Sequence, residues 1–355
     1  MRTSTRPPRP STPSSFVYKC KITEFHHSIR CKNTSGAPQM DAQTRQILAR
    51  FKRQVVFHSQ YKFAFSQIEN AIENTETLGE PLCAILYGVS GSGKSTLCKY
   101  FEKYHSSDPV IRRDDGTYVQ LPIFYCEVPA PTTVRGLIGN MLTTLIGQEP
   151  KGTIVKLTQQ LSTCLHTANV KVIFLDEIQL LCVTTISQKV KLDTLNWIVT
   201  LLNKSGIPII LSGTELCRDI RNSLDTFAKR YPYVAELTNF SYESHSDSDY
   251  LTVLKQLDSA MYSIASIQSG VHLNDPSIAA AIFVATSGNF KIMRLIISDA
   301  LKSCLQREGA NELKLEDFYM ACECLSLPDR LTDENPFALD LNENLLTISS
   351  SAEKN

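Results

Sequence analysis

Short apolar runs alternate with amphipathic segments over the central part of the chain. Four of the runs are rich in β-branched residues and have the length of buried strands: Leu82–Tyr87, Leu121–Val128, Val170–Leu175 and Ile207–Ser212. A weaker run follows at Val234–Leu237. Between the runs, apolar residues recur at helical spacing, as at Leu192, Leu195, Val199 and Leu202. This alternation predicts an α/β fold with a doubly wound parallel sheet.

Beyond about residue 242 only helical patterns continue, at 247–268, 276–286, 289–305 and 315–325. We therefore expect an α/β domain over residues 41–242, including helices near 42–56 and 61–76, and a small all-helical domain over residues 243–328. Residues 1–40 are expected to form a basic, largely disordered arm, and residues 329–355 a polar tail. The acidic and apolar stretch 333–341 in this tail is interpreted either as a peptide that docks on a partner or as a frayed terminus.

Charge and cysteine content narrow the class of protein. The 36 basic and 36 acidic side chains balance, but residues 1–62 hold twelve basic and only two acidic ones, a net charge of +10. Such a segment suggests either a polyanionic partner or a solvated arm. The 11 cysteines lie mostly inside apolar runs, which favours reduced thiols and a cytoplasmic protein. The apolar stretches are too short to span a bilayer and the N-terminus lacks the apolar core of a secretory signal, so we expect no membrane partner.

A complete phosphate-loop motif, G-x-x-x-x-G-K-S, follows the first apolar run. Its glycines allow successive backbone N–H groups to surround phosphate oxygens at the start of a helix. Lys94 is expected to reach the β- and γ-phosphates of a nucleoside triphosphate, and the Ser95 hydroxyl to bind Mg²⁺. The residues expected to hold the nucleotide are Gly88, Val89, Ser90, Gly91, Ser92, Gly93, Lys94, Ser95 and Thr96.

Two later strands end in polar residues that complete such a site. Asp176 and Glu177 follow the run at 170–175, and the carboxyl ends of parallel strands meet at the edge of the sheet where ligands bind. We expect Asp176 to hold Mg²⁺ through water and Glu177 to orient the attacking water, although the pair could instead cap the next helix. Thr214 follows the run at 207–212 and is the candidate to bind the γ-phosphate or the water, with an ordinary turn as the alternative.

Arginines are the remaining candidates, because a guanidinium that a neighbouring subunit supplies stabilises transition-state charge. Arg230, before Tyr231 and Pro232, is the first choice for such a finger and Arg221 the second. In the helical domain, Arg294 is expected to face the phosphates. Each of these arginines could equally be a solvated surface charge.

The order of phosphate loop, Asp-Glu strand, hydroxyl strand, arginine and helical domain resembles the AAA+ ATPase fold, which implies ATP and Mg²⁺ as cofactors. More narrowly, the stretches 173–181 (I-F-L-D-E-I-Q-L-L) and 207–215 (I-P-I-I-L-S-G-T-E) resemble the TniB/TnsC family of transposition ATPases. The stretch 128–137 (V-P-A-P-T-T-V-R-G-L), followed by Leu145–Gly147 and Gly152-Thr153, is similar to the same family. The resemblance covers about residues 55–325.

This resemblance implies an ATP-dependent regulator of DNA transposition that assembles head to tail on double-stranded DNA as a ring or filament. Such a homo-oligomer would connect a target-selection protein to the transposase, and ATP hydrolysis would drive its disassembly. Arg135 and Thr153 fall where family members contact the DNA backbone, and Lys151 is a nearby candidate. Tyr231 is a departure, because the family often has phenylalanine after the finger arginine.

Two other functions fit a chain with these motifs. An AAA+ ATPase of the secretion type acts on protein partners, but it usually carries a membrane span or a peptidoglycan-binding module, for which the sequence gives no sign. An initiator of the origin-recognition type would need a winged-helix domain after the helical one, and residues 330–355 are expected to be too few to build it.

Overall fold

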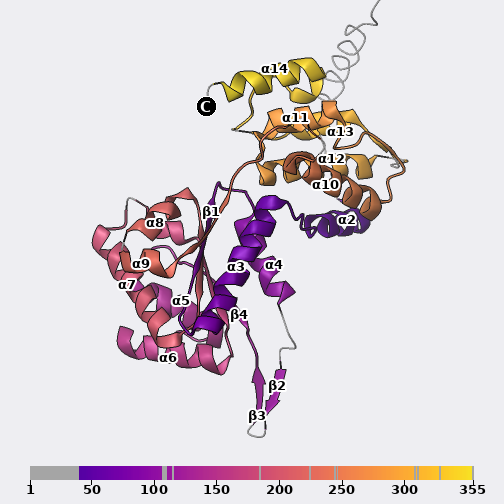
Figure 1. The fold of residues 1–355 in the computed structure, drawn as a ribbon. Coiled ribbons are helices and arrows are strands. Elements are labelled where there is room, and N and C mark those ends of the chain that lie inside the picture. Colours follow the sequence, from indigo (N-terminus) through magenta and orange to yellow (C-terminus); the bar gives the residue numbers. More distant parts are fainter. Residues whose placement is uncertain are drawn as a thin grey trace, which may run out of the picture.

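The computed structural model describes residues 40–353 except 106–109, 114, 115, 184, 224, 244, 246, 308, 310, 311 and 328. The predicted basic arm therefore lies, apart from Met40, outside the described residues. What is described forms two bodies, an α/β base and a helical lid, that meet at the end of strand β1 (Figure 1).

The base is built on a parallel sheet of five strands in the order β4-β5-β6-β1-β7. The strands are β1 (Ala84–Gly88), β4 (Ile123–Glu127), β5 (Val172–Asp176), β6 (Ile209–Gly213) and β7 (Tyr233–Leu237). All five predicted apolar runs therefore contain strands. The register pairs Tyr87 with Gly213 and Glu127 with Asp176, so the polar strand ends lie along one edge of the sheet.

Helices cover both faces of this sheet, as the doubly wound prediction requires. One face packs on α3 (Ser59–Leu78) and α4 (Lys94–Tyr104), with Leu86 and Phe174 facing their buried side chains. The other packs on α5 (Val134–Ile146), α6 (Ile154–Thr167) and α7 (Gln188–Ser205), with Ile85 and Ile173 facing that way. Alternate strand residues thus enter opposite cores, which is why the runs read as continuously apolar. Among the described helices, none has the combined length and apolarity that crossing a membrane requires.

Shorter elements complete the base. The 3₁₀ turn η1 (Ile178–Leu181) follows β5, and η2 (Glu215–Cys217), α8 (Arg218–Asn222) and α9 (Asp225–Arg230) connect β6 to β7. An antiparallel hairpin of β2 (Val110–Arg113) and β3 (Gly116–Val119) extends away from the sheet between α4 and β4 (Figure 1). The pattern of apolar runs did not predict this hairpin.

The lid contains the four predicted helices, α10 (Asp249–Ala265), α11 (Pro276–Thr286), α12 (Phe290–Gln306) and α13 (Leu315–Glu323). A short parallel bridge of β8 (Ser269–Gly270) and β9 (Glu312–Leu313) joins the loops that follow α10 and α12. Helix α2 (Ala42–Lys52) packs against α10 and α12, and Phe51 is fully buried in the lid core. The α/β domain was predicted to begin at residue 41, whereas the apolar face of α2 is covered by the lid and not by the base.

The residues after 328 also belong to the lid. They form the 3₁₀ turn η3 (Pro336–Ala338) and helix α14 (Leu341–Ala352), which lies along α11 (Figure 1). Phe337 is 3 % exposed and stacks on Phe318 with ring centroids 5.6 Å apart. The Asn335 amide donates to the Tyr319 carbonyl at 3.0 Å. The stretch predicted as a free docking peptide or a frayed end is instead held by its apolar residues in the lid core.

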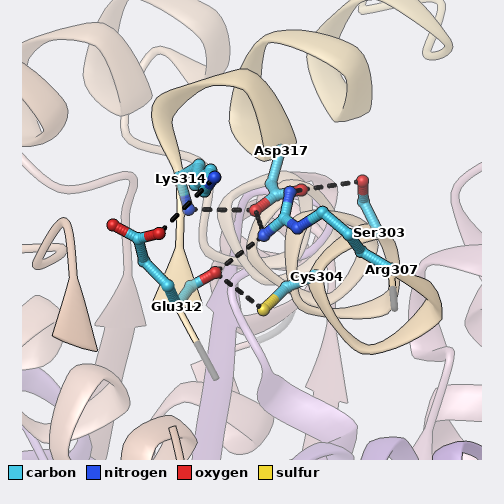
Figure 2. A network of polar contacts seen from close by, with 6 residues as sticks. All are labelled: Ser303, Cys304, Arg307, Glu312, Lys314 and Asp317. Carbon is cyan, nitrogen blue, oxygen red and sulfur yellow. Dashed lines mark hydrogen bonds and ion pairs between the residues drawn. The ribbon is translucent and has the colours of Figure 1, made fainter. Parts of the chain in front are cut away.

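A polar network fixes the far end of α12 to the start of α13. Asp317 is 2 % exposed, and the Arg307 guanidinium donates to both of its carboxylate oxygens, at 2.9 and 3.0 Å (Figure 2). The same carboxylate accepts from the Ser303 hydroxyl and the Lys314 backbone N–H. Arg307 also donates to the Glu312 carbonyl at 2.7 Å. Because every oxygen of the buried carboxylate is paired, the network stabilises the lid.

Candidate nucleotide site

The phosphate loop runs from the end of β1 at Gly88 to the start of α4 at Lys94. Gly91 and Gly93 have φ angles of 84° and 97°, a region that favours glycine. A Cβ atom at Gly93 would overlap the Tyr61 hydroxyl, and one at Gly91 would lie 2.8 Å from Asn289 Oδ1. The loop is therefore closely covered by α3 on one side and by the lid on the other, and only glycine fits at both positions.

The Lys94 side chain lies within the loop. Its Nζ donates to the carbonyl oxygens of Gly88 at 2.9 Å and Val89 at 2.8 Å. Burial lowers the pKa of Lys94, while the nearby charges of Asp176 and Glu177 act in the opposite direction. The loop carbonyls thus hold the ammonium group at the place where phosphate oxygens would compete for it.

Asp176, the last residue of β5, is 2 % exposed. Its carboxylate accepts from the Tyr125 hydroxyl at 2.6 Å and from the Glu177 backbone N–H at 3.0 Å. Burial, and then the hydrogen bond and the charge of Asp176, raise the pKa of Tyr125, so the phenol remains a donor. Sequence reasoning missed Tyr125; the available signal was its position two residues before the end of β4, on the same face of the sheet as Asp176.

Glu177 and Thr214 lie at the ends of adjacent strands and share one neighbour, Gln179. Glu177 has a φ of 60°, a left-handed conformation that is uncommon outside glycine. Its carboxylate accepts from the Gln179 amide, and the Gln179 carbonyl oxygen accepts from the Thr214 backbone N–H at 3.2 Å. The Thr214 hydroxyl is buried and has no partner among the described residues. Such an orphaned donor at the edge of a cavity fits a site for an oxygen-rich ligand.

A cavity of about 880 Å³ opens between the loop, the strand ends and the lid, a volume in the range of ligand pockets. Among the predicted site residues it is lined by Ser90, Gly91, Gly93, Lys94, Ser95, Thr96, Glu177, Thr214 and Arg294. Ser92 and Asp176 are buried and do not line it. With the backbone cradle and the unpartnered Thr214 hydroxyl, this lining fits a nucleoside triphosphate. Ser95 and Asp176 suit Mg²⁺, because Asp176 keeps oxygen lone pairs beyond the two that accept hydrogen bonds.

The lid contacts the phosphate loop through residues that the sequence analysis did not select. The Asn289 amide donates to the Ser90 carbonyl at 2.9 Å, and the Lys291 backbone N–H donates to the Gly91 carbonyl at 3.1 Å. The side chain of Lys291 is exposed and lines the cavity. The available signal was the Gly288-Asn289 pair at the start of α12, since a helix that begins there directs its first turn at the loop.

Arg294 lines the cavity, but its guanidinium does not face the phosphate loop. It donates to the carbonyl oxygens of Phe51 at 2.8 Å, Lys52 at 3.2 Å and Gln54 at 2.5 Å. Burial lowers the pKa of Arg294, although the guanidinium stays charged at neutral pH. The prediction that this side chain faces the phosphates is therefore corrected: it binds carbonyl oxygens at and just after the end of α2, where a helix leaves acceptor capacity unused.

The candidate finger arginines lie away from the cavity of their own subunit. The Arg230 carbonyl accepts from the Cys83 N–H at 2.7 Å, directly before β1, so Arg230 lies at the edge of the sheet opposite the phosphate loop. The Arg221 Nε donates to the Tyr231 carbonyl at 2.9 Å. Tyr231 itself is fully buried and stacks on Phe227. A finger that acts on a neighbouring subunit must lie outside its own site, so Arg230 stays a prediction.

The three DNA candidates lie together, and none of them lines the nucleotide cavity. Arg135 is in the first turn of α5, and its Nη1 donates to the Gly152 carbonyl at 2.7 Å. Thr153 follows as the N-cap of α6, and the Lys151 side chain is exposed beside it. Two helix N-termini and two cations therefore share one surface, an arrangement that favours phosphate.

Comparison with known proteins bears on the family and the fold of the chain. A family model described as "Bacterial TniB protein" matches residues 37–241. No curated protein matches the chain. Among solved structures, the ORC1 protein of Aeropyrum pernix in complex with DNA is similar over 79 % of this chain and 70 % of its own, with 16 % identity and a TM-score of 0.53. The ORC2 protein of Aeropyrum pernix, in ADPNP–ADP complexes, is similar over 82 % and 70 %, with 11 % identity and a TM-score of 0.52. At such identities the likeness shows the fold, which is the AAA+ fold that the order of motifs predicted.

Proposed function

Because the chain belongs to the TniB family, we propose that it is an ATPase that assembles on double-stranded DNA and regulates transposition. In this proposal the assembly connects a target-selection protein to the transposase, and ATP hydrolysis drives disassembly. The observation that carries it is a single cavity lined by the phosphate loop, Glu177, Thr214 and the lid helix α12. A site that holds the triphosphate between two bodies can couple the state of the nucleotide to their relative position.

In this proposal the residues of the cavity have different roles in ATP hydrolysis. Lys94 would exchange the loop carbonyls for the β- and γ-phosphates, and Ser95 and Asp176 would hold Mg²⁺, which neutralises phosphate charge when bound. Glu177 orients the attacking water and accepts its proton, while the Thr214 hydroxyl donates to the γ-phosphate or to that water. In this proposal Arg230 of a neighbouring subunit completes the site.

DNA binding is assigned to the surface around Arg135, Lys151 and Thr153. One or two cations per subunit contact phosphates without reading bases, so the binding is expected to tolerate any sequence and to weaken with salt. The contact between Arg135 and Gly152 joins the starts of α5 and α6, which keeps these groups on one face. A row of subunits would repeat this face along the duplex.

Oligomerisation follows from the placement of Arg230 in the same proposal. If Arg230 acts on the nucleotide of a neighbour, each subunit presents two different faces, one with the cavity and one with the arginine. Such a heterologous contact produces a ring when the rotation closes and a helical filament when it does not.

Electron microscopy with long double-stranded DNA tests the proposal directly. With a slowly hydrolysed ATP analogue we expect rings or filaments threaded by DNA, and none without nucleotide. Lys94→Ala should abolish this assembly, because it removes the cation that binds the phosphates. Nucleotide binding without any DNA-dependent assembly would contradict the proposal and favour an AAA+ ATPase that acts on protein partners.

A salt titration tests the DNA surface. Arg135→Ala should weaken binding at every DNA sequence and reduce the slope of log K against log salt by about one per subunit. Lys204→Ala is the matched control, because Lys204 is an exposed lysine at the end of α7, away from this surface. Equal slopes for the two variants would remove Arg135 from the interface.

A further inference from the structure

Gln179 lies between the two residues that are assigned to the attacking water. It is the second residue of η1, and the buried side chains of Ile178 and Leu181 anchor this turn in the core. The anchored turn leaves the Gln179 amide at the rim of the nucleotide cavity, which it lines together with Glu177 and Thr214. Each end of the amide meets one of these two residues.

The chemistry of the partners fixes the orientation of this amide. An ionised carboxylate can only accept and a backbone N–H can only donate. The amide nitrogen must therefore face Glu177 and the carbonyl oxygen must face Thr214, as the structure has them. Exchanging the amide oxygen and nitrogen would place two acceptors together at Glu177 and two donors together at Thr214. Only one orientation of the amide therefore satisfies both contacts.

The surrounding backbone is shaped to this arrangement. A Cβ atom at Gly213 would overlap both the Gln179 carbonyl oxygen and the Cys217 Sγ atom, so glycine at the end of β6 makes room for both side chains. Glu177 adopts its left-handed conformation, with φ 60° and ψ 30°, directly before the turn. A non-glycine residue in this region carries strain of about 1–3 kcal/mol, and such strain persists where contacts hold the residue in place. The Gln179 amide is such a contact.

We propose that Gln179 is a positioning residue for ATP hydrolysis, which holds the Glu177 carboxylate toward the γ-phosphate and connects it to the strand end at Thr214. This inference rests on the proposed hydrolysis at this site. Because both ends of the Gln179 amide are bound by Glu177 and Thr214, we expect Gln179 to affect the chemical step and to leave nucleotide binding intact. A misplacement of about 1 Å in a catalytic group can lower a rate by about a hundredfold.

The first test is single-turnover hydrolysis at saturating ATP, with nucleotide affinity measured on the same samples. Gln179→Ala should lower the rate by about ten- to a hundredfold with an unchanged dissociation constant. Gln179→Glu keeps the shape and the contact with the Thr214 N–H, but places a carboxylate against Glu177, and should lose as much. Gln188→Ala, at an exposed glutamine at the start of α7, is the control.

A double-mutant cycle with Glu177→Gln separates positioning from a general structural effect. If Gln179 acts through Glu177, Gln179→Ala should cause little further loss in the Glu177→Gln background. An equal loss in both backgrounds, or an unchanged or raised rate in Gln179→Ala alone, would overturn the inference while the proposed ATPase stands. If the wild-type protein binds ATP without hydrolysing it, the proposed hydrolysis fails and this inference fails with it.

Discussion

Asn289 is the residue through which the contact between lid and phosphate loop can be tested most cleanly. Its carbonyl oxygen accepts from the Ile292 N–H and caps α12, while its nitrogen donates to the Ser90 carbonyl and to Asn239 Oδ1. Asn289→Ser keeps a side-chain oxygen that caps a helix but removes the amide donor. The substitution therefore removes the side-chain hydrogen bond between the lid and Ser90 and leaves the start of α12 intact.

The size of the effect follows from the geometry. Asn289 is 7 % exposed but Ser90 is exposed, so water can replace the lost donor at the Ser90 carbonyl and the loss costs about 0.5–1.5 kcal/mol. The bond from the Lys291 N–H to the Gly91 carbonyl remains and limits the loss. A loss of this size in the order of the loop should lower the affinity for an ATP analogue by about two- to twelvefold.

Titration with a fluorescent ATP analogue measures this loss, and denaturant unfolding measures stability in parallel. Asn289→Ala is the companion variant: it removes the cap as well and should lower the free energy of unfolding by about 1 kcal/mol more than the serine variant. Both variants should lose the same nucleotide affinity. Wild-type affinity in Asn289→Ser would refute the reasoning, because the loop would then not depend on the lid for its order.

Three further predictions concern stability. Burial lowers the pKa of His58 to about 4, against about 6.5 in the unfolded chain. The free energy of unfolding therefore falls as pH falls from 6.5 toward 4, by about 2 kcal/mol between pH 7.5 and 5. In guanidinium unfolding, His58→Phe should lack this decrease of about 2 kcal/mol, and an unchanged pH dependence would contradict the assignment. Phe337→Ala should destabilise the lid by about 3–5 kcal/mol, and the control Leu346→Ala, at a side chain 67 % exposed, by less than about 0.5 kcal/mol in the same assay. Equal losses would mean that the tail is not part of the core. Arg307→Lys keeps the charge but loses the two-point contact with the buried Asp317, so thermal unfolding should show a free energy of unfolding about 1–2 kcal/mol lower. Wild-type stability in this variant would mean that the network does not stabilise the lid.

The sequence predicted those features whose signal is local. A phosphate loop needs its glycines and Lys94 in one short stretch, and the buried strands show as continuous apolar runs. The ends of those strands placed Asp176, Glu177 and Thr214 near the loop, because parallel strands present their carboxyl ends at one edge. That edge is where the structure has them.

The features that the sequence did not predict depend on contacts between distant segments. The amphipathic pattern of α2 shows that one of its faces is buried, but not whether the base or the lid covers it. Arg294 lies four residues into α12, and only the position of α2 decides that its guanidinium meets backbone carbonyls. Phe337 lies in a polar, acidic stretch whose composition resembles a solvated tail, and the ring of Phe318 that covers it lies in another helix.

The position of α2 also has a consequence for how the chain is made. Arg294 and Phe51 are 243 residues apart, so α2 leaves the ribosome long before the helices that cover its apolar face. The whole base is synthesised in between. It can fold as a unit before the helices that pack on α2 exist, since domains generally fold in order of synthesis. The lid is then the last part to fold, because α2 must pair with helices that lie far away in the sequence, and such non-local contacts form slowly. A fragment that ends at residue 241 would keep α2 without the lid helices that cover it. A fragment from about residue 57 to residue 241 would contain the base alone.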